Sequence, residues 1–303
     1  MNVLVGTADG LFSLDGNGSS EPKLAGHRIS AFDEDWAIVD AQSVVYQTDA
    51  GWRQALTVKT PEPSLGISGA MVARGDEAIV GWGGSLTRVF KTRRFEPIAG
   101  FEDVPGRDEW HAVGSRKPYV RSLTATAGGV LLANVHVGGI PRSTDEGATW
   151  QPTIDVDADV HEVRAHPERP DLVLAAAAVG LCRSDDGGAT WKVQTDGLHA
   201  SYCRAVALAG DLLLVSASTG PFTEQGAIYR RAIDDEGPVE RCTEGLPEWQ
   251  PHNIDTGCLD TDGTRAVFGG ADGIVYGSED AGRTWRVFAD GLPPVTAVAI
   301  DRA

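Results

Sequence analysis

The chain of 303 residues has few cysteines, no long apolar run and no obvious leader. Its four cysteines, at positions 182, 203, 242 and 258, lack Cys-x-x-Cys spacing and stand in strand-like runs, which favours buried free thiols over a disulfide or a metal centre. No stretch approaches the roughly 18 uninterrupted apolar residues of a membrane helix. The N-terminus lacks a basic start followed by an apolar core. We therefore expect a cytoplasmic protein.

Basic charge is also scarce. The chain holds 43 acidic residues against 26 Lys and Arg, so its formal net charge is −17. A protein this acidic repels phosphate backbones and anionic lipid surfaces, which argues against nucleic acid and membranes as partners. Charge does not specify the fold, so the fold has to be inferred from internal repeats.

Three segments share the pattern Ser-x-Asp-x-Gly-x-Thr-Trp, at residues 143–150, 184–191 and 278–285. The second interval is about twice the first, so one degenerate unit is expected between the last two copies, and 228–237 lies there. A shortened copy occurs at 47–52. Each full copy lies between two short apolar runs, which predicts a hairpin turn between strands. We call these three segments the repeat turns.

The pattern of the repeat turns resembles the Asp box of the BNR-repeat superfamily, which includes sialidases, sortilin-like receptors and photosystem assembly factors. The resemblance implies a β-propeller in which the boxes lie on the face opposite the ligand site. The residues themselves suggest a structural role, because Ser and Asp side chains bond backbone N–H groups of a turn and Gly accepts a positive φ. We therefore expect Asp145, Asp186 and Asp280 to be structural.

Seven apolar runs precede turn signals, at 3–10, 37–40, 78–82, 130–135, 172–177, 212–216 and 266–270. They predict one all-β domain over residues 1–303, a seven-bladed β-propeller. Because the first run begins at residue 3, the first blade lacks an innermost strand. We expect the last segment, 295–301, to supply it and so to close the ring.

The predicted innermost strands are 27–33, 67–73, 120–126, 160–166, 203–209, 254–260 and 295–301. The fourth and sixth residues of these strands are mostly apolar, whereas the second residue of each of the seven strands is polar. This predicts a polar ring at the channel mouth. Its members are Arg28, Ser68, Arg121, His161, Arg204, Asp255 and Thr296.

Arginine is well shaped to bind carboxylate or phosphate, so the ring suggests a site for a small anionic molecule. The competing interpretation is that these groups solvate the channel and pair with Asp255 or other carboxylates. Six of the seven histidines, all but His166, map to the same face, as do the two long loops 101–119 and 216–226. The candidate substrate-binding residues are Arg28, Arg121, Arg204, His252, Asp255, Trp110 and Trp249.

Two kinds of chemistry fit such a face. His161, Tyr202 or Glu224 could act as general base or nucleophile in a hydrolase or lyase. Alternatively, His111, His136 and His161 could converge from separate blades to bind a divalent transition metal.

The sequence leaves open whether the protein is an enzyme at all. A non-catalytic scaffold would bind a peptide or protein on the same face. A sialidase or other glycosidase is a third alternative, although the Phe-Arg-Ile-Pro-like motif of sialidases is missing; the string at 28–32 does not match it.

Overall fold

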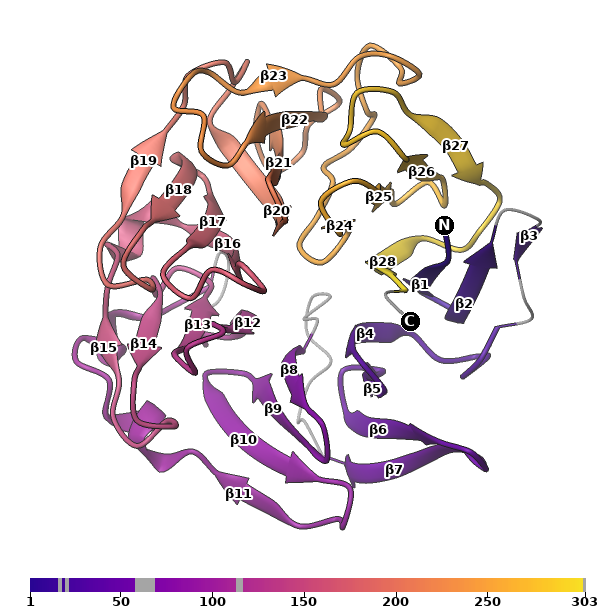
Figure 1. The fold of residues 1–303 in the computed structure, drawn as a ribbon. Helices are drawn as coiled ribbons and strands as arrows, with labels where there is room; N and C mark the ends of the chain where they lie inside the picture. The colour runs from indigo at the N-terminus through magenta and orange to yellow at the C-terminus, as the bar shows by residue number, and fades with distance from the viewer. Residues whose placement is uncertain (16–17, 20–21, 58–68, 113–116, 302–303) are drawn as a thin grey trace.

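In the computed structural model, seven four-stranded antiparallel sheets stand in a ring around a central channel (Figure 1). The structure describes residues 1–15, 18–19, 22–57, 69–112 and 117–301. The prediction of an all-β, seven-bladed propeller is confirmed.

In blades two to seven, the strands run in chain order from the channel outward. Blade two comprises β4 (Ile29–Asp33), β5 (Trp36–Val39), β6 (Ser43–Thr48) and β7 (Gly51–Thr57). Blade three comprises β8 (Ala70–Arg74), β9 (Glu77–Trp82), β10 (Ser85–Phe90) and β11 (Phe95–Pro97). Blade four comprises β12 (Val120–Ala125), β13 (Leu131–Val135), β14 (Pro141–Ser143) and β15 (Gln151–Pro152).

The second half of the ring repeats this order. Blade five comprises β16 (Val160–Ala165), β17 (Val173–Ala177), β18 (Gly180–Ser184) and β19 (Lys192–Gln194). Blade six comprises β20 (Tyr202–Ala209), β21 (Leu212–Ser218), β22 (Ala227–Ala232) and β23 (Glu240–Arg241). Blade seven comprises β24 (Leu259–Thr261), β25 (Ala266–Gly269), β26 (Val275–Ser278) and β27 (Arg286–Ala289).

Blade one joins the two ends of the chain. Its strands are β28 (Val295–Ile300), β1 (Val3–Thr7), β2 (Gly10–Asp15) and β3 (Gly18–Ser19), in that order outward. The innermost strand β28 pairs with β1 so that Val3 faces Ile300 and Val5 faces Val298. This pairing confirms the expected closure, and it leaves the innermost edge of β1 covered.

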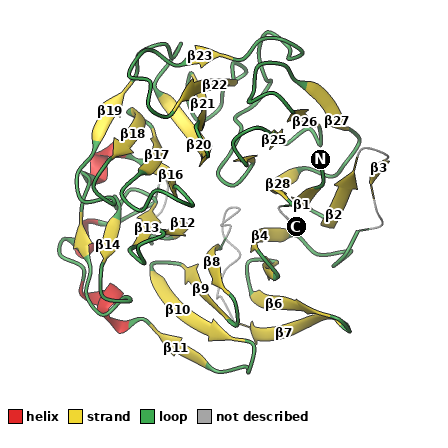
Figure 2. Ribbon diagram, in the orientation of Figure 1, coloured by secondary structure: helices red, strands yellow, loops and turns green. Residues whose placement is uncertain are grey.

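Helix is scarce in the described part of the chain, as Figure 2 shows. It is limited there to three 3-10 segments, η1 (Ala99–Asp103), η2 (Arg107–Glu109) and η3 (Val156–Ala158). Among the described residues, no helix has the length and apolar character needed to cross a membrane.

The core lies between the blades, where apolar faces of neighbouring sheets pack together. The second strand of each blade is buried on both faces over most of its length, and β13, β17 and β21 are buried throughout. Their sequences are accordingly continuous apolar runs rather than alternating ones. The second strands of the blades therefore gave the clearest signal in the sequence.

At four of the seven junctions between neighbouring blades, a polar side chain of an innermost strand accepts a backbone N–H bond from the next blade. Asp33 accepts from Ala73 at 2.7 Å, and Ser122 accepts from Val163 at 2.9 Å. Glu162 accepts from Val206 at 3.1 Å, and Asp260 accepts from Ile300 at 2.9 Å. Inside this ring lies a cavity of about 750 Å³, lined in part by Asp33, Glu162, Arg164, Asp260 and Thr296.

The strand order fixes two faces of the ring. The innermost strands begin at one face, which we call the top face, and the connections from outermost to innermost strand and from second to third strand lie there. The repeat turns join third and fourth strands and so lie on the opposite, bottom face. His166 follows the end of β16 and also lies at the bottom, whereas the other six histidines belong to top-face segments.

The repeat turns have one common hydrogen-bond pattern. In the first, the Asp145 carboxylate accepts from the Thr149 N–H and hydroxyl at 2.9 and 2.6 Å, and from the Ser143 hydroxyl at 2.8 Å. Asp186 and Asp280 make the same three contacts in their own turns. These bonds hold the pKa of each carboxyl at about 2. All three carboxylates are thus occupied within their own turns.

Candidate functional site

At the mouth of the channel, the side chains of the innermost strands do not alternate regularly between the two faces of the sheet. Register shifts interrupt the pairing of five innermost strands with their neighbours. They lie between Ile29 and Ala31, Val120 and Ser122, Val160 and Glu162, Cys203 and Val206, and Val295 and Ala297. A bulge redirects the side chain of the extra residue and is common beside functional sites. The residues at these bulges include four members of the predicted ring, namely Arg121, His161, Arg204 and Thr296.

Other ring members lie elsewhere. Arg28 precedes β4 and is exposed, with its backbone N–H bonded to Asp40, and Ser30 takes the bulge position of that blade. The alignment of this strand was therefore wrong by two residues, because the polar pair His27 and Arg28 lies before the strand. Ser68 lies outside the described residues. Thr296, by contrast, lies at the β28 bulge, where it donates its hydroxyl to the Ile29 carbonyl and so links two blades.

Asp255 was predicted within a strand from 254 to 260, but β24 begins at Leu259. The preceding residues form a turn in which Gly257 has a φ of +75° and the Cys258 N–H bonds the Asp255 carbonyl. This turn lies toward the centre of the ring (Figure 1). It is held from blade four, because Arg121 donates to Asp255 at 2.7 Å and to Thr256 at 2.8 Å.

Arg204, from blade six, also donates to Asp255, at 2.9 Å. Burial opposes ionisation of this carboxyl, but the two guanidinium groups outweigh it and hold the pKa of Asp255 at about 2. We call Arg121 and Arg204 the arginine pair. The competing interpretation of the ring, pairing with Asp255, accordingly describes part of what these two arginines do.

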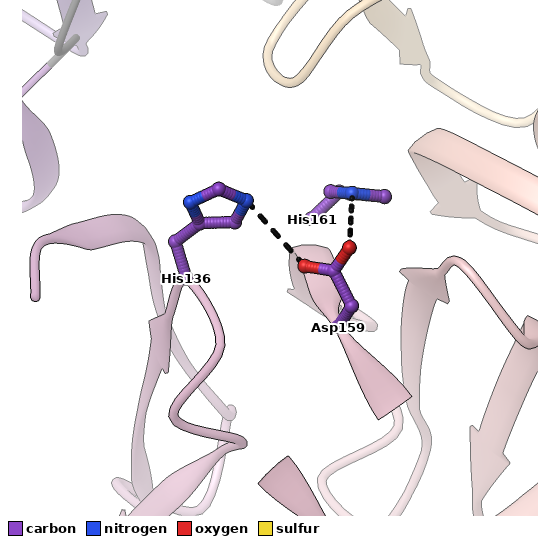
Figure 3. Close-up of side chains that lie close together, drawn as sticks. All are labelled: His136, Asp159 and His161. Atoms are coloured by element: carbon purple, nitrogen blue, oxygen red, sulfur yellow. Dashed lines mark ion pairs between the residues drawn. The ribbon is translucent and has the colours of Figure 1, made fainter. Parts of the chain in front are cut away.

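Beside the arginine pair, His136, Asp159 and His161 converge from blades four and five, as Figure 3 shows. The Nε2 atom of His136 lies 3.4 Å from Oδ1 of Asp159, and Nε2 of His161 lies 3.5 Å from Oδ2. His161 is fully buried, and His136 is 7% exposed. We call these three residues the His–Asp–His group.

Local structure positions each member. His136 begins the tight turn between β13 and β14, where Gly139 takes a φ of +72° and a Cβ would lie 2.6 Å from the Ile154 carbonyl oxygen. Asp159 ends η3 in the left-handed region, at a φ of +47°, a conformation that Asp adopts more readily than most residues. His161 stands at the β16 bulge, and its Nδ1 lies 2.6 Å from the Cys203 carbonyl oxygen.

Two tyrosines flank the group. The Tyr119 ring lies 5.0 Å from that of His136, and the Tyr202 ring lies 4.8 Å from that of His161. The Tyr202 hydroxyl accepts from Arg204 at 3.3 Å. Burial and, second, the Arg121 charge lower the pKa of His136 to about 4. Burial likewise lowers the pKa of His161, so both imidazoles are neutral at pH 7.

The structure does not bring every candidate into this site. Trp110 is buried against Phe101, with ring centroids 5.4 Å apart, so its prediction as a substrate-binding residue is corrected to a core role. In the described part of this loop, η2 and the end of η1 lie before Trp110, and Phe101 and Val104 pack with Trp110 into the core. His111 is exposed, pairs with the Glu109 carbonyl, and is not part of the His–Asp–His group.

The remaining candidates lie around the top rim. His252 faces Asp272 at 3.2 Å, and the Trp249 ring carries the Arg241 guanidinium at 3.7 Å. Glu224 is exposed on the loop between β21 and β22. Figure 3 contains neither His252 nor Glu224, and the described contacts link neither to the His–Asp–His group.

Sequence reasoning missed Asp159 and Glu162. The spacing Asp-x-His at 159–161, at the start of an innermost strand, was the available signal for Asp159. Glu162 is almost fully buried, and burial raises its pKa; Arg164 and the backbone N–H groups of Val206 and Gly257 bind its carboxylate. A carboxylate buried between blades could not be separated from surface acids by sequence pattern alone.

No protein-family model matches the sequence, and no curated protein matches it. The resemblance to the Asp-box superfamily therefore stays a prediction. Solved structures do match. The computationally designed Ika8 protein is 14% identical, with a TM-score of 0.61, over 99% of this chain and 87% of that one. The GH74 enzyme of Niastella koreensis is 15% identical, with a TM-score of 0.61, over 94% of this chain.

This chain spans only 46% of that GH74 enzyme. The WD40 β-propeller domain of Doa1 is 14% identical, with a TM-score of 0.56, over 90% of this chain and 81% of that one. A designed protein, an enzyme and a WD40 domain thus share one architecture at this low identity. The likeness establishes a β-propeller fold, and the function has to be argued from the site.

Proposed function

We propose that this protein binds a small anionic molecule at the top face, beside the arginine pair, and acts on it as a hydrolase or lyase. The observation that carries the proposal is that two arginines share one carboxylate. Arg121 and Arg204 both bond Asp255, so one positive charge of the three groups is uncompensated. The arginine side chains are only 9% and 18% exposed, which strengthens their field in the mouth.

One N–H donor of Arg204 is not used in a hydrogen bond within the described part of the protein. Its Nη1 bonds Asp255 and its Nη2 bonds the Tyr202 hydroxyl, whereas its buried Nε has no hydrogen-bond partner. An unpaired buried donor is costly, and a carboxylate or phosphate oxygen would satisfy it. A ligand of this chemistry fits the donors better than a neutral one.

Groups for proton transfer stand next to this position. The Tyr202 phenol contacts Arg204, and His161 packs on the Tyr202 ring. Both belong to the residue types that serve as general acid or base beside an anion. Glu224, the third catalytic candidate, lies on a neighbouring top-face loop and would have to move toward the substrate.

The test is a thermal-shift screen of small carboxylates and phosphates, followed by calorimetry on any anion that stabilises the protein. Losing a charged hydrogen-bond donor costs about 1.5–3 kcal/mol, so Arg204→Gln should weaken binding by about 10- to 100-fold. Arg53→Ala, which removes an exposed arginine of the outermost strand β7, is the matched control and should bind as the wild type does. Equal affinity of Arg204→Gln and wild type would refute the site.

One observation favours a second function, a scaffold for a peptide or protein. Phe222 is 99% exposed on the top face. Its loop is braced, because Asn253 donates to the carbonyls of Gly220 and Pro221 and accepts from Ser218. If no anion stabilises the protein while Phe222→Ser abolishes binding of a partner, the scaffold function is preferred.

A further inference from the structure

The buried imidazole of His161 presents an unsatisfied lone pair. Its Nδ1 lies 2.6 Å from the Cys203 carbonyl oxygen, which can only accept, so Nδ1 carries the proton. The neutral ring then exposes a lone pair at Nε2. That atom has no hydrogen-bond partner in the structure, and the whole residue is 0% exposed.

What faces this lone pair is another acceptor. The carboxylate of Asp159 lies beside it, with Oδ2 3.5 Å away. A lone pair and a carboxylate repel one another unless a cation lies between them. On the other side of the same carboxylate, Nε2 of His136 lies 3.4 Å from Oδ1, and Oδ1 has no hydrogen-bond partner either. The Nε2 atoms of His136 and His161 and the carboxylate of Asp159 therefore converge on one point.

The spacing fits a metal ion. A tetrahedral ion bound to nitrogen and oxygen at about 2.0–2.2 Å places adjacent ligand atoms roughly 3.4 Å apart. Each histidine Nε2 lies at about this distance from one of the two carboxylate oxygens of Asp159, and one ligand atom from each residue lies within 4.8 Å of the others. Among the described residues, this is the one group of three histidine, cysteine or acidic side chains with such spacing.

The surroundings resemble those of a metal centre. The Nδ1–H of His161 bonds a backbone carbonyl, the arrangement that fixes the tautomer and orientation of ligating histidines. The charges also agree. Arg121, Arg204 and Asp255 together carry one positive charge, which the charge of Asp159 alone would cancel. A divalent ion bound to Asp159 would therefore give the site two positive charges for an anion to neutralise.

We propose that His136, Asp159 and His161 bind a divalent transition-metal ion, of the class of Zn²⁺, Fe²⁺ or Mn²⁺, with coordination positions left open toward the top face. Two imidazoles and one carboxylate with open positions are a donor set typical of catalytic Zn²⁺ and non-haem Fe²⁺. The ion would act as a Lewis acid on an anionic ligand. Because His161 would then be a metal ligand, it could not serve as the general base, and Tyr202 would remain for that role.

The test uses the full chain and the metal alone. Protein treated with a chelator is titrated with Co²⁺, whose visible absorption reports coordination number, and then with Zn²⁺, Fe²⁺ and Mn²⁺ by calorimetry. We expect one ion per chain with a spectrum of four or five ligands. Asp159→Asn keeps the size of the side chain and tolerates the left-handed backbone, so the variant should fold. Asp159→Asn should weaken metal binding by about 100-fold or more. This loss is larger than that expected when only a hydrogen-bond partner of a metal ligand is removed.

Two controls make the result specific. His27 contacts Asp40 at 2.7 Å on the surface, so His27→Ala removes a histidine–carboxylate pair that is not a metal site and should leave the affinity unchanged. His111→Ala should also bind normally. Stoichiometric binding lost in Asp159→Asn and His136→Gln supports the proposal. No binding by the wild type, or equal binding by Asp159→Asn, overturns it. Loss in His111→Ala with retention in Asp159→Asn overturns it as well.

No anion is present in this titration, so the metal site and the proposed anion site fail separately. Circular dichroism of each variant shows whether it is folded. If His161→Gln unfolds, Asp159→Asn and His136→Gln still decide the outcome.

Discussion

Closure of the ring by the last strand can be tested with one side chain. Ile300 is 3% exposed and faces Val3, which is fully buried, across the β1–β28 pairing. Replacing a buried Ile by Ala costs about 2–5 kcal/mol, because transfer energy is lost and a cavity is left. The entropy of unfolding is about 2.1 cal/mol/K per residue, or roughly 0.6 kcal/mol/K for this chain. Ile300→Ala should therefore lower the melting temperature by about 3–8 °C.

The assay is differential scanning calorimetry with a matched control. Val193 lies on β19 near the outside of blade five and is 53% exposed, so Val193→Ala should shift the melt by about 1 °C or less. Deleting residues 295–303 removes all of β28, including its buried Val295, Ala297, Val298 and Ile300, and should abolish the cooperative transition. If Ile300→Ala melts no lower than Val193→Ala, the last strand does not close the ring as described.

Three further predictions concern the repeat turns and the thiols. Asp186→Ala removes the acceptor of the Thr190 and Ser184 hydrogen bonds, so it should lower the melting temperature and leave any anion-induced shift at the top face unchanged. The pKa of Asp186 is lowered to about 2, so its contribution to stability is present above the unfolded pKa near 3.8 and is lost as the pH falls toward 2. The difference in melting temperature between wild type and Asp186→Ala should thus stay constant from pH 7 to about pH 4.5 and shrink below; a difference that grows on acidification would contradict this. All four cysteines are buried, and burial raises the pKa of Cys182 and Cys242 to about 12, so a disulfide reagent at pH 8 should label none in the native protein and all four after unfolding.

Much of the fold could be predicted from sequence because its signals are local. A hairpin turn is determined by a few adjacent residues, as in Ser143, Asp145 and Gly147, and strands buried on both faces appear as apolar runs. Blade number followed from counting such runs. The closure of blade one was also predictable, because the first apolar run lacked an inner partner strand and the last segment of the chain had none of its own.

The candidate site was less predictable because it depends on irregular backbone. Alternation assumes a regular strand, and the bulges at Arg121 and His161 break it. Asp255 was predicted on an innermost strand beside the arginines. It does contact them, but from a turn that precedes β24. Trp110 was assigned to the rim because its loop is long, whereas η1 and η2 fold that loop partly into the core.

The sequence already showed that most histidines belong to top-face segments, but it did not show that Asp159 lies between two of them. Of three histidines considered for a metal, His136 and His161 converge, and Asp159 joins them in place of His111. The Asp-x-His spacing at 159–161 is a weak signal, and little else in the sequence distinguishes this aspartate among 43 acidic residues as a ligand. The left-handed backbone at the end of η3, which directs Asp159 to the histidines, became visible only in three dimensions.

The central claim is that chemistry lies at the top face, in the His–Asp–His group, and not at the repeat turns. The most direct measurement is anomalous X-ray diffraction from crystals grown with Zn²⁺ alone. We predict one strong anomalous peak between Nε2 of His136, Nε2 of His161 and the Asp159 carboxylate. Crystals without a peak there, or with peaks only at the repeat-turn carboxylates, would contradict the account.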